Sequence, residues 1–313
     1  MFRFLLCIFA LLIGGLGLAK IFEQPKSLLI INSKNEASLP RNFRTPFEWD
    51  ETTIENEVFL PDLTGFRSLH ISGSAQFSQK SLESILDRLK HPSNFIIIDL
   101  RQEYHGFLDG VPVSWYGIRN GENVGKSIAQ ITKGEKKLLK KLIKEKDIIL
   151  SRMVYKDKFG LKLPEAVSIP FTATGFSTEE ELAAHYQLGY IRIPVADALR
   201  PTDDMVDRFI TVVKGLPKDA WLHFHCAAGV GRTTSFMSMY DMMFHAKEVS
   251  FSDMIQRQNA IGGSNLGKYG SENSWKYSYA VERYQFLKDF HEYCRLNDDN
   301  FDTSWSDYLL SKK

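Results

Sequence analysis

The chain has 313 residues, of which 43% are hydrophobic and 25% are charged, a composition typical of a globular protein with one large domain or two small ones. Its 39 Lys and Arg residues balance 38 Asp and Glu residues, which argues against nucleic acid as a partner because the chain has no overall basic field. A polyanionic ligand would have to be bound by local groups of basic side chains.

The first 19 residues have the features of a secretory signal peptide. Arg3 precedes the uncharged run 4–19, which ends in the small-residue sequence Gly17-Leu18-Ala19. This run of 16 residues is shorter than the roughly 20 that are needed to span a bilayer. We therefore expect cleavage at this point, export to the periplasm or the medium, and no stable membrane association of the mature chain. An uncleaved membrane anchor is the alternative.

The rest of the chain is expected to comprise an irregular segment over 20–41 and a folded part over 42–313. In the first half, the apolar pattern predicts a strand from Leu69 that turns at Gly73, a helix over 79–90, a buried strand over Phe95–Leu100, a turn-rich segment over 106–117, a helix within 128–147 and β-structure over 148–169. In the second half, it predicts a helix with Ser177 and Glu180 as its capping box, strands over Tyr190–Val195 and Trp221–Phe224, and helices over 201–216, 235–246, 250–259 and 272–296. This alternation indicates an α/β fold with a mostly parallel central sheet.

Charged residues gather where the strand Phe95–Leu100 ends. Ligand-binding groups of open α/β sheets lie at the carboxyl ends of the strands, so Arg101 and Glu103 could contact a substrate. A structural ion pair between these two side chains explains them equally well.

The most informative stretch is Trp221–Thr234, WLHFHCAAGVGRTT, in which a short apolar strand leads through a loop with two glycines into a helix. The backbone N–H groups of such a loop and the N-terminus of the helix converge on one point and attract an anion. Arg232 adds a planar guanidinium that matches phosphate oxygens. The same positive field is expected to lower the pKa of Cys226, so the sequence predicts an oxyanion site with a nucleophile at its centre.

This pattern is the His-Cys-x5-Arg-Thr signature of the cysteine-dependent phosphatases, the protein-tyrosine-phosphatase (PTP) superfamily. Two other interpretations remain: a buried structural Cys226 with a surface arginine, and a metal site formed by His223, His225 and Cys226, in which the glycines and the arginine would have no role. After signal cleavage the one other cysteine is Cys294. It lies in a helical pattern over 284–296, so we expect a buried, unreactive thiol and no disulfide that would block the nucleophile.

Cleavage of a phosphate ester also needs a proton donor, because an alkoxide leaves poorly unless it is protonated as the P–O bond breaks. Asp197 follows the predicted strand Tyr190–Val195 and lies 29 residues before Cys226. If the two strands are neighbours, both side chains lie at the same edge of the sheet. The alternative is a loop aspartate that caps a turn.

Several segments together resemble the bacterial PTP-like myo-inositol phosphatases, the cysteine phytases. These segments are 42–45, ISGSAQFS at 71–78, DLRQE at 99–103, VSWYG at 113–117, the block 220–234, Arg257-Gln258 with Ile261-Gly262-Gly263, and Ser274-Trp275-Lys276. The resemblance runs from about Pro40 to the C-terminus. It implies a PTP-like core, in which a mixed, mostly parallel sheet is flanked by helices, and a small β-barrel-like accessory domain formed from parts of 42–68 and 118–175.

The resemblance also implies an activity: stepwise hydrolysis of phosphate from myo-inositol hexakisphosphate through a phosphocysteine intermediate, without a metal or other cofactor. Cys226 would be the nucleophile and Asp197 the general acid. Thr233 would stabilise the thiolate, and His225 would brace the loop. The phosphate oxygens would be bound by Arg232 and by the backbone amides of Ala227, Ala228, Gly229, Val230 and Gly231.

Further residues are assigned by the resemblance to the surroundings of the nucleophile. Arg44, Lys162, Lys276 and Arg283 would bind peripheral phosphates, and Gln258 would position a water molecule. The chain departs from the family's pattern at three positions: Ala227 replaces a charged residue, Asn120 an acidic residue and Ala280 an aromatic one. Two alternative functions remain: a phosphatase for phosphotyrosine or another phosphomonoester, although no aromatic recognition loop is found, and an inactive phospholigand-binding module.

Overall fold

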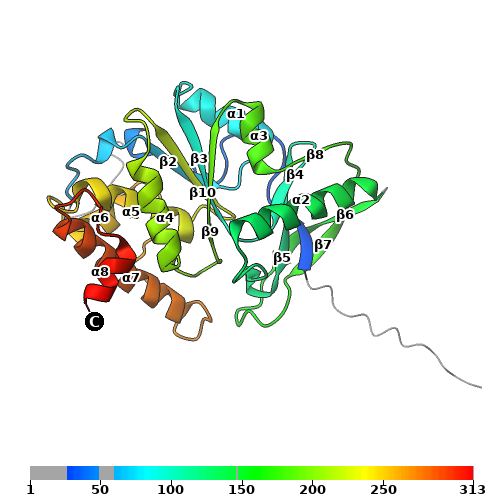
Figure 1. Cartoon of the computed structure of the whole chain (residues 1–313). Helices are drawn as coiled ribbons and strands as arrows, with labels where there is room; N and C mark the ends of the chain where they lie inside the picture. The colour runs from blue at the N-terminus through cyan, green and yellow to red at the C-terminus, as the bar shows by residue number, and fades with distance from the viewer. Residues whose placement is uncertain (1–26, 49–59, 146, 313) are drawn as a thin grey trace, which may run out of the picture.

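The computed structural model of the chain describes residues 27–48, 60–145 and 147–312, so the predicted signal peptide lies outside the described residues. Two sheets, both accompanied by helices, make up this part of the chain (Figure 1). The predicted α/β class, with mixed strand directions and flanking helices, is confirmed.

The first sheet has four strands, all parallel. In spatial order they are β2 (Ile71–Ala75), β10 (Trp221–Cys226), β3 (Phe95–Arg101) and β9 (Gly189–Val195). One apolar core joins it to α4 (Asp203–Lys214), α5 (Gly231–His245), α6 (Phe251–Ala260), α7 (Tyr277–Leu296) and α8 (Trp305–Ser311), and a second joins it to α1 (Gln79–Arg88) and α3 (Glu179–His185). Because both faces of this sheet are covered, its central strands β10 and β3 are buried along almost their whole length.

The second sheet has six strands and is mainly antiparallel. Its order is β7 (Glu165–Phe171), β6 (Ile148–Tyr155), β1 (Ser27–Ile31), β5 (Val111–Gly117), β4 (His105–Leu108) and β8 (Phe176–Ser177), and the pairing of β1 with β6 is parallel. The helix α2 (Ile128–Lys144) packs on it through Leu139. Within the described ranges no pairing joins β7 to β8, so the expected barrel-like closure is not confirmed. The described residues also form three short 3-10 helices: η1 (Pro46–Glu48), η3 (Phe66–Ser68) and η4 (Ile118–Asn120).

Two predictions of irregular structure were wrong. The segment 20–41 contains the strand β1, which pairs with β5 over all five of its residues. The segment 106–117 is a hairpin rather than a series of turns: β4 and β5 are joined at Asp109 and Gly110, which both have positive φ, as a two-residue hairpin turn requires. In both cases the strands are specified by pairing with other parts of the chain, which the local pattern does not contain.

Two local details also differ from the prediction. Gly73 does not turn the chain, since β2 runs straight through it. A Cβ at this position would lie 2.5 Å from Sδ of Met237, so the glycine allows α5 to pack closely on the sheet. The capping box of α3 is shifted by one residue and consists of Thr178 and Glu181.

The strands of the second sheet come from 27–31 and 105–177, while the described residues within 42–68 hold only 3-10 helices and an isolated bridge at Arg44. The predicted division of the chain into domains remains a prediction. In the part of the chain that the structure describes, no helix combines the length and the apolar character needed to cross a membrane.

Candidate active site

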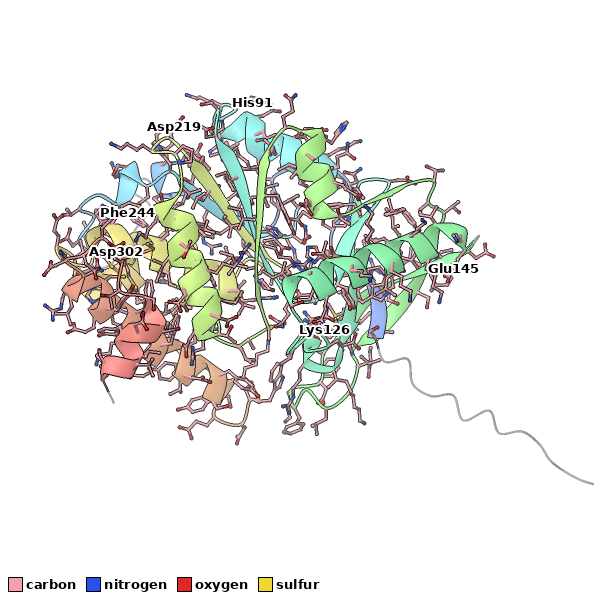
Figure 2. The ribbon with its side chains drawn as sticks, in the orientation of Figure 1. His91, Lys126, Glu145, Asp219, Phe244 and Asp302 are labelled. Atoms are coloured by element: carbon pink, nitrogen blue, oxygen red, sulfur yellow. The ribbon has the colours of Figure 1, made fainter. Side chains whose placement is uncertain are left out.

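The four parallel strands all end at one edge of their sheet, and the candidate site lies there. In Figure 2, His91 and Asp219 mark the opposite edge, because β3 and β10 begin shortly after them. The strand β10 ends at Cys226, and α5 begins five residues later at Gly231. The loop between them therefore points its amides, together with the N-terminus of α5, toward the end of the strand.

The loop depends on a glycine for its shape. Gly229 has a φ of +70°, and a Cβ on it would lie 2.2 Å from the backbone nitrogen of Ala75 in β2. This close approach turns the Gly229 N–H toward the cysteine, where it donates to Sγ of Cys226 at 3.3 Å. The hydroxyl of Thr233 donates to the same sulfur at 3.2 Å.

These contacts favour the thiolate form of Cys226, which is only 3% exposed. Burial alone would raise its pKa, but the positive charge of Arg232 and the hydrogen bond from Thr233 outweigh burial and lower the pKa below that of an ordinary cysteine. Cys294 differs: it is a free, buried thiol in α7, and burial raises its pKa well above the ordinary value. The expected buried thiol without a disulfide is thus confirmed at this position, its lack of reactivity stays a prediction, and Cys226 is also free.

The guanidinium of Arg232 is held in place by the carboxylate of Glu103, for which the sequence suggested an ion pair with Arg101. Glu103 accepts from both terminal nitrogens of Arg232, at 2.8 and 3.0 Å, in a bidentate arrangement. Glu103 also accepts from Nε of Arg101 at 2.8 Å, so the proposed ion pair at the end of β3 exists as well. Although burial opposes it, the charges of Arg232 and Arg101 hold the pKa of Glu103 far below its usual range.

Asp197 lies beside this arginine although the expected neighbouring of the two strands is wrong: β3 lies between β9 and β10, and the side chains meet because all these strands end at the same edge of the sheet. Its Oδ1 is 3.2 Å from Nη2 of Arg232 and accepts from the backbone N–H of Ala198 at 3.1 Å. The carboxyl group is 29% exposed and faces the same pocket as the thiol. The structure therefore brings Cys226, Arg232, Thr233 and Asp197 together, and their catalytic roles remain predictions.

Two buried histidines of β10 lie beneath the loop. Nε2 of His225 is 2.5 Å from Oε1 of Glu179, which anchors the residue before the nucleophile to α3. His223 has both ring nitrogens close to serine hydroxyls, those of Ser72 and Ser74, and its burial lowers its pKa to about 3. The brace predicted at His225 thus has a defined partner.

The metal site considered for this region is not formed by the residues proposed. Among the described residues, the group with suitable spacing is Asp99, His105 and Glu179, all buried. Arg192 lies 3.1 Å from Asp99, and, although burial opposes it, the carboxylates of Asp99 and Glu135 raise the pKa of His105 to about 10. Because the cationic Arg192 is paired with both Asp99 and Glu135 beside His105, we explain this cluster as a buried network of ion pairs.

A pocket of about 580 Å³ opens above the loop, and it is strongly basic. Its lining includes the loop residues Ala227, Ala228, Val230 and Gly231, and the cationic side chains Arg41, Arg101, Arg152, Lys156, Arg232, Lys276 and Arg283. Asp197 supplies the one carboxyl group among the residues that line it. The predicted positions Lys276 and Arg283 are thus confirmed as part of the pocket, although their role in binding is untested.

Three other predicted residues lie elsewhere. Arg44 is buried behind the loop, where its guanidinium donates to the backbone oxygen of Gly229 at 2.7 Å and to Oγ1 of Thr234 at 2.9 Å; it braces the loop from the side away from the pocket. Lys162 lines a separate groove. Gln258 is fully buried in α6 and does not line the pocket.

The sequence analysis also missed basic residues of the pocket wall. Arg152 lies on β6, Lys156 follows the end of that strand, and Arg41 precedes the segment 42–45. Lys156 lies at the tip of the hairpin that β6 and β7 form, where its ammonium lies 4.7 Å from the centroid of the Tyr116 ring. The several basic residues near this tip are the feature of the sequence from which a basic wall could have been inferred.

Comparisons with known proteins agree with this geometry. The family model of the PTP-like phytases, described by the words "inositol hexakisphosphate", matches residues 98–244. The chain is 32% identical to a PTP-like phytase from Bdellovibrio bacteriovorus, with a TM-score of 0.68; the match covers 92% of this chain and 97% of that one. It is 35% identical to the PTP-like myo-inositol phosphatase of Mitsuokella multacida in complex with myo-inositol-(1,3,4,5)-tetrakisphosphate, with a TM-score of 0.81.

Some relatives are considerably longer than the matched region. The Mitsuokella match covers 90% of this chain and 49% of that one, and a further structure from the same organism is named as a tandemly repeated phytase. The effector protein hopD2 of Pseudomonas syringae pv. tomato is 24% identical over 248 residues, which are 78% of this chain and 52% of hopD2. The chain thus spans about half the length of these relatives.

Proposed function

Because the chain belongs to the family of PTP-like phytases, we propose that it is a cysteine-dependent phosphatase that removes phosphates stepwise from myo-inositol hexakisphosphate. The observation that carries the proposal is the basic pocket above a thiol whose pKa is lowered. The inositol tetrakisphosphate in the complex of the Mitsuokella relative supports this class of substrate. The predicted signal peptide supports export to the periplasm or the medium.

The charge of the pocket fits a substrate with many phosphates. Glu103 already neutralises part of the charge of Arg101 and Arg232. The other basic side chains of the wall, Arg41, Arg152, Lys156, Lys276 and Arg283, form no ion pair with a described residue. They would meet the phosphates that are not being cleaved, because each phosphate brings a charge that must be matched locally.

In the first step, the thiolate of Cys226 attacks phosphorus in line, and the S–P bond forms as the P–O bond breaks. Arg232 and the amides of the loop bind the equatorial oxygens, on which the negative charge is spread. Asp197, in its protonated form, gives its proton to the leaving oxygen of the inositol, so that an alcohol leaves instead of an alkoxide.

In the second step, a water molecule attacks the phosphocysteine. Asp197 accepts a proton from this water, the S–P bond breaks, and inorganic phosphate leaves with the thiolate restored. The hydroxyl of Thr233 and the N–H of Gly229 stabilise the sulfur anion as it returns. His225, held by Glu179, keeps the loop in position.

The three departures from the family's pattern all lie in the wall of this pocket: Ala227, Asn120 and Ala280. None of them removes a group that takes part in the two steps. We therefore propose that they alter which phosphate of the ring is presented to Cys226, which a product-isomer profile from the hexakisphosphate would reveal.

The test is release of inorganic phosphate from myo-inositol hexakisphosphate by the whole chain, compared with Cys226→Ser and with Cys294→Ala as the matched control. We expect Cys226→Ser to lose about 10⁴-fold or more of the activity, because the nucleophile is gone, and Cys294→Ala to retain it. Acid quenching during turnover should trap phosphate on Cys226. No release by the wild-type chain, or faster turnover of phosphotyrosine peptides, would refute the proposed substrate; no release from any phosphomonoester, together with no phosphate trapped on Cys226, would favour a binding module.

A further inference from the structure

A second groove lies next to the basic pocket and is mainly apolar. It encloses about 980 Å³, within the range of small-molecule sites. Four segments line it: residues 118–124, the β6–β7 hairpin at 161–163, the chain at the start of α7 with Trp275 and Tyr279, and the loop 196–199. Asp197, in the last of these segments, lines the groove as well as the basic pocket. We call it the Trp275 groove.

Large apolar side chains from two of these segments are exposed in the groove. Val124 is 61% exposed, Leu161 65% and Ile118 50%. Single exposed apolar residues are common on protein surfaces, but residues that come from separate segments and converge on one concave site indicate a binding surface. Covering them would remove apolar area from water, which favours binding.

The walls of the groove are attached to one another, so the groove exists before any ligand arrives. The guanidinium of Arg119 lies 5.1 Å from the centroid of the Trp275 ring, and its Nε donates to the backbone oxygen of Gly160 at 3.2 Å. Gly160 has a φ of +65°, and a Cβ there would lie 2.7 Å from Nε1 of Trp275. The side chain of Trp275 thus brings the chain before α7 into direct contact with the β6–β7 hairpin.

The charges of the groove favour an anionic group at its edge. Lys162 is exposed and forms no salt bridge with a described residue, although the pKa of Asp157 is lowered by a hydrogen bond from the backbone N–H of Leu161 and also by the charge of Lys162. Of the two carboxyl groups that line the groove, that of Asp197 is engaged by Arg232, and the side chain of Glu122 packs over Gly117. Two cations lie over the ring of Trp275, the guanidinium of Arg119 at 5.1 Å and the ammonium of Lys276 at 5.4 Å from its centroid, which favours an electron-rich, anionic ligand beside it.

We propose that the Trp275 groove binds a small amphipathic anion, with a planar apolar body against Trp275, Tyr279 and Leu161 and an anionic group on Lys162. The site is distinct from the phosphate loop, and the two can be occupied together because the loop 196–199 stands between them. A ligand in the groove contacts Ala196 and Leu199, the neighbours of Asp197. The proposal does not depend on the substrate proposed above.

The probe for this site is 8-anilinonaphthalene-1-sulfonate, an aromatic anion whose fluorescence rises when it leaves water. We expect Val124→Glu to weaken its binding to the folded whole chain about tenfold, because the change places a charge in the apolar wall. Val167→Glu is the matched control: Val167 is 47% exposed on β7 and outside the groove, so the same change of charge should leave the dissociation constant within about twofold.

A second pair of probes tests the anionic group. Lys162→Met should weaken binding of the anilinonaphthalene sulfonate about fivefold and leave the neutral N-phenyl-1-naphthylamine unchanged. Inorganic phosphate at saturating concentration should displace neither probe. Thermal melting verifies that each variant is folded, and Leu161→Glu, on another wall, takes the place of Val124→Glu if that variant does not fold.

Three results would overturn the proposal. Equal losses in Val124→Glu and Val167→Glu would mean that the probe binds without a defined site. Displacement by phosphate would place the probe in the loop of Cys226. A concentration-dependent dimer of the wild type that Val124→Glu abolishes would mean that the surface meets a second copy of the chain. None of these results bears on phosphate release, so the two proposals fail separately.

Discussion

The two sheets contribute to the candidate site in different ways. The parallel sheet supplies Cys226, Glu103 and Asp197 from the ends of three strands, and hydrogen bonds hold the first two in a buried environment. The six-stranded sheet and its hairpin supply Arg152 and Lys156, which are exposed at the wall of the pocket. This difference suggests that one sheet determines whether the reaction occurs and the other which substrate is preferred.

Among substitutions that remove one charge from the residues supplied by the parallel sheet, Asp197→Asn is expected to have the largest effect. Asp197→Asn should lower kcat for the hexakisphosphate about 10²- to 10⁴-fold, because the leaving oxygen no longer receives a proton. KM should change little. With p-nitrophenyl phosphate, whose leaving group needs no proton, the loss should be much smaller; steady-state kinetics on both substrates measures the contrast.

The control for this change is Asp204→Asn, in the first turn of α4, which lies outside the pocket. It should leave kcat on both substrates unchanged. Equal losses for Asp197→Asn on the two substrates would contradict the role of proton donor and would point to a disturbed loop.

Glu103→Gln tests whether the positioning of Arg232 depends on the buried carboxylate. The change keeps the shape of the side chain but leaves Arg101 without its carboxylate partner and Arg232 with Asp197 as its remaining one, so we expect a loss of about 10- to 100-fold in kcat/KM. It should also lower the free energy of unfolding by about 3 kcal/mol, as expected when a buried ion pair is broken. Denaturant unfolding and kinetics on the same preparations measure both effects.

The matched control is Glu36→Gln, which removes the carboxylate of the exposed pair between Lys34 and Glu36. Exposed pairs contribute little, so neither stability nor activity should change measurably. If Glu103→Gln had as little effect as Glu36→Gln, the inference that the buried carboxylate of Glu103 positions Arg232 would be wrong.

The sequence was most informative where function depends on contiguous residues. Cys226 and Arg232 are separated by a loop whose geometry follows from a strand, two glycines and a helix, so their meeting could be predicted without tertiary information. Asp197 could be placed because parallel strands share one edge. These arguments need only the order of the elements.

The sequence was least informative where a side chain meets a partner from a distant segment. Arg44 and Lys162 are both basic residues in loops, yet one is buried against Gly229 and the other lines a separate groove. The strand β1 was missed because its partner β5 lies more than 80 residues further along the chain. Tertiary packing decides such positions, and a local pattern does not contain it.

A smaller effect is expected at Thr233, and it appears in the pH dependence. The pKa of Cys226 is lowered, so the thiolate is lost only when the pH falls below this lowered value. Burial tends to raise the pKa, and the hydroxyl of Thr233 is one of the groups that counteract burial; Thr233→Ala should therefore move the midpoint of alkylation by iodoacetamide to higher pH. Turnover should fall about tenfold, since the returning thiolate loses a hydrogen bond.

Ser235→Ala serves as the control, because its hydroxyl donates to the backbone oxygen of Gly231 and does not contact the sulfur. Its alkylation profile should coincide with that of the wild type. Cys294 should remain unmodified throughout, since its pKa is raised by burial, and mass spectrometry of the alkylated peptides verifies this. An unchanged midpoint in Thr233→Ala would show that Arg232 alone sustains the thiolate.

The smallest effect is expected at the wall of the pocket that the six-stranded sheet supplies. Lys156→Met should raise KM for the hexakisphosphate about fivefold and leave kcat unchanged, because an exposed charge contributes about 1 kcal/mol to binding a phosphate. KM for p-nitrophenyl phosphate should not change, since its single phosphate occupies the loop. Lys158→Met, in the same hairpin tip but outside the pocket, is the matched control. An equal rise in KM for both variants, suppressed by added salt, would reveal general electrostatic attraction instead of a defined contact at Lys156.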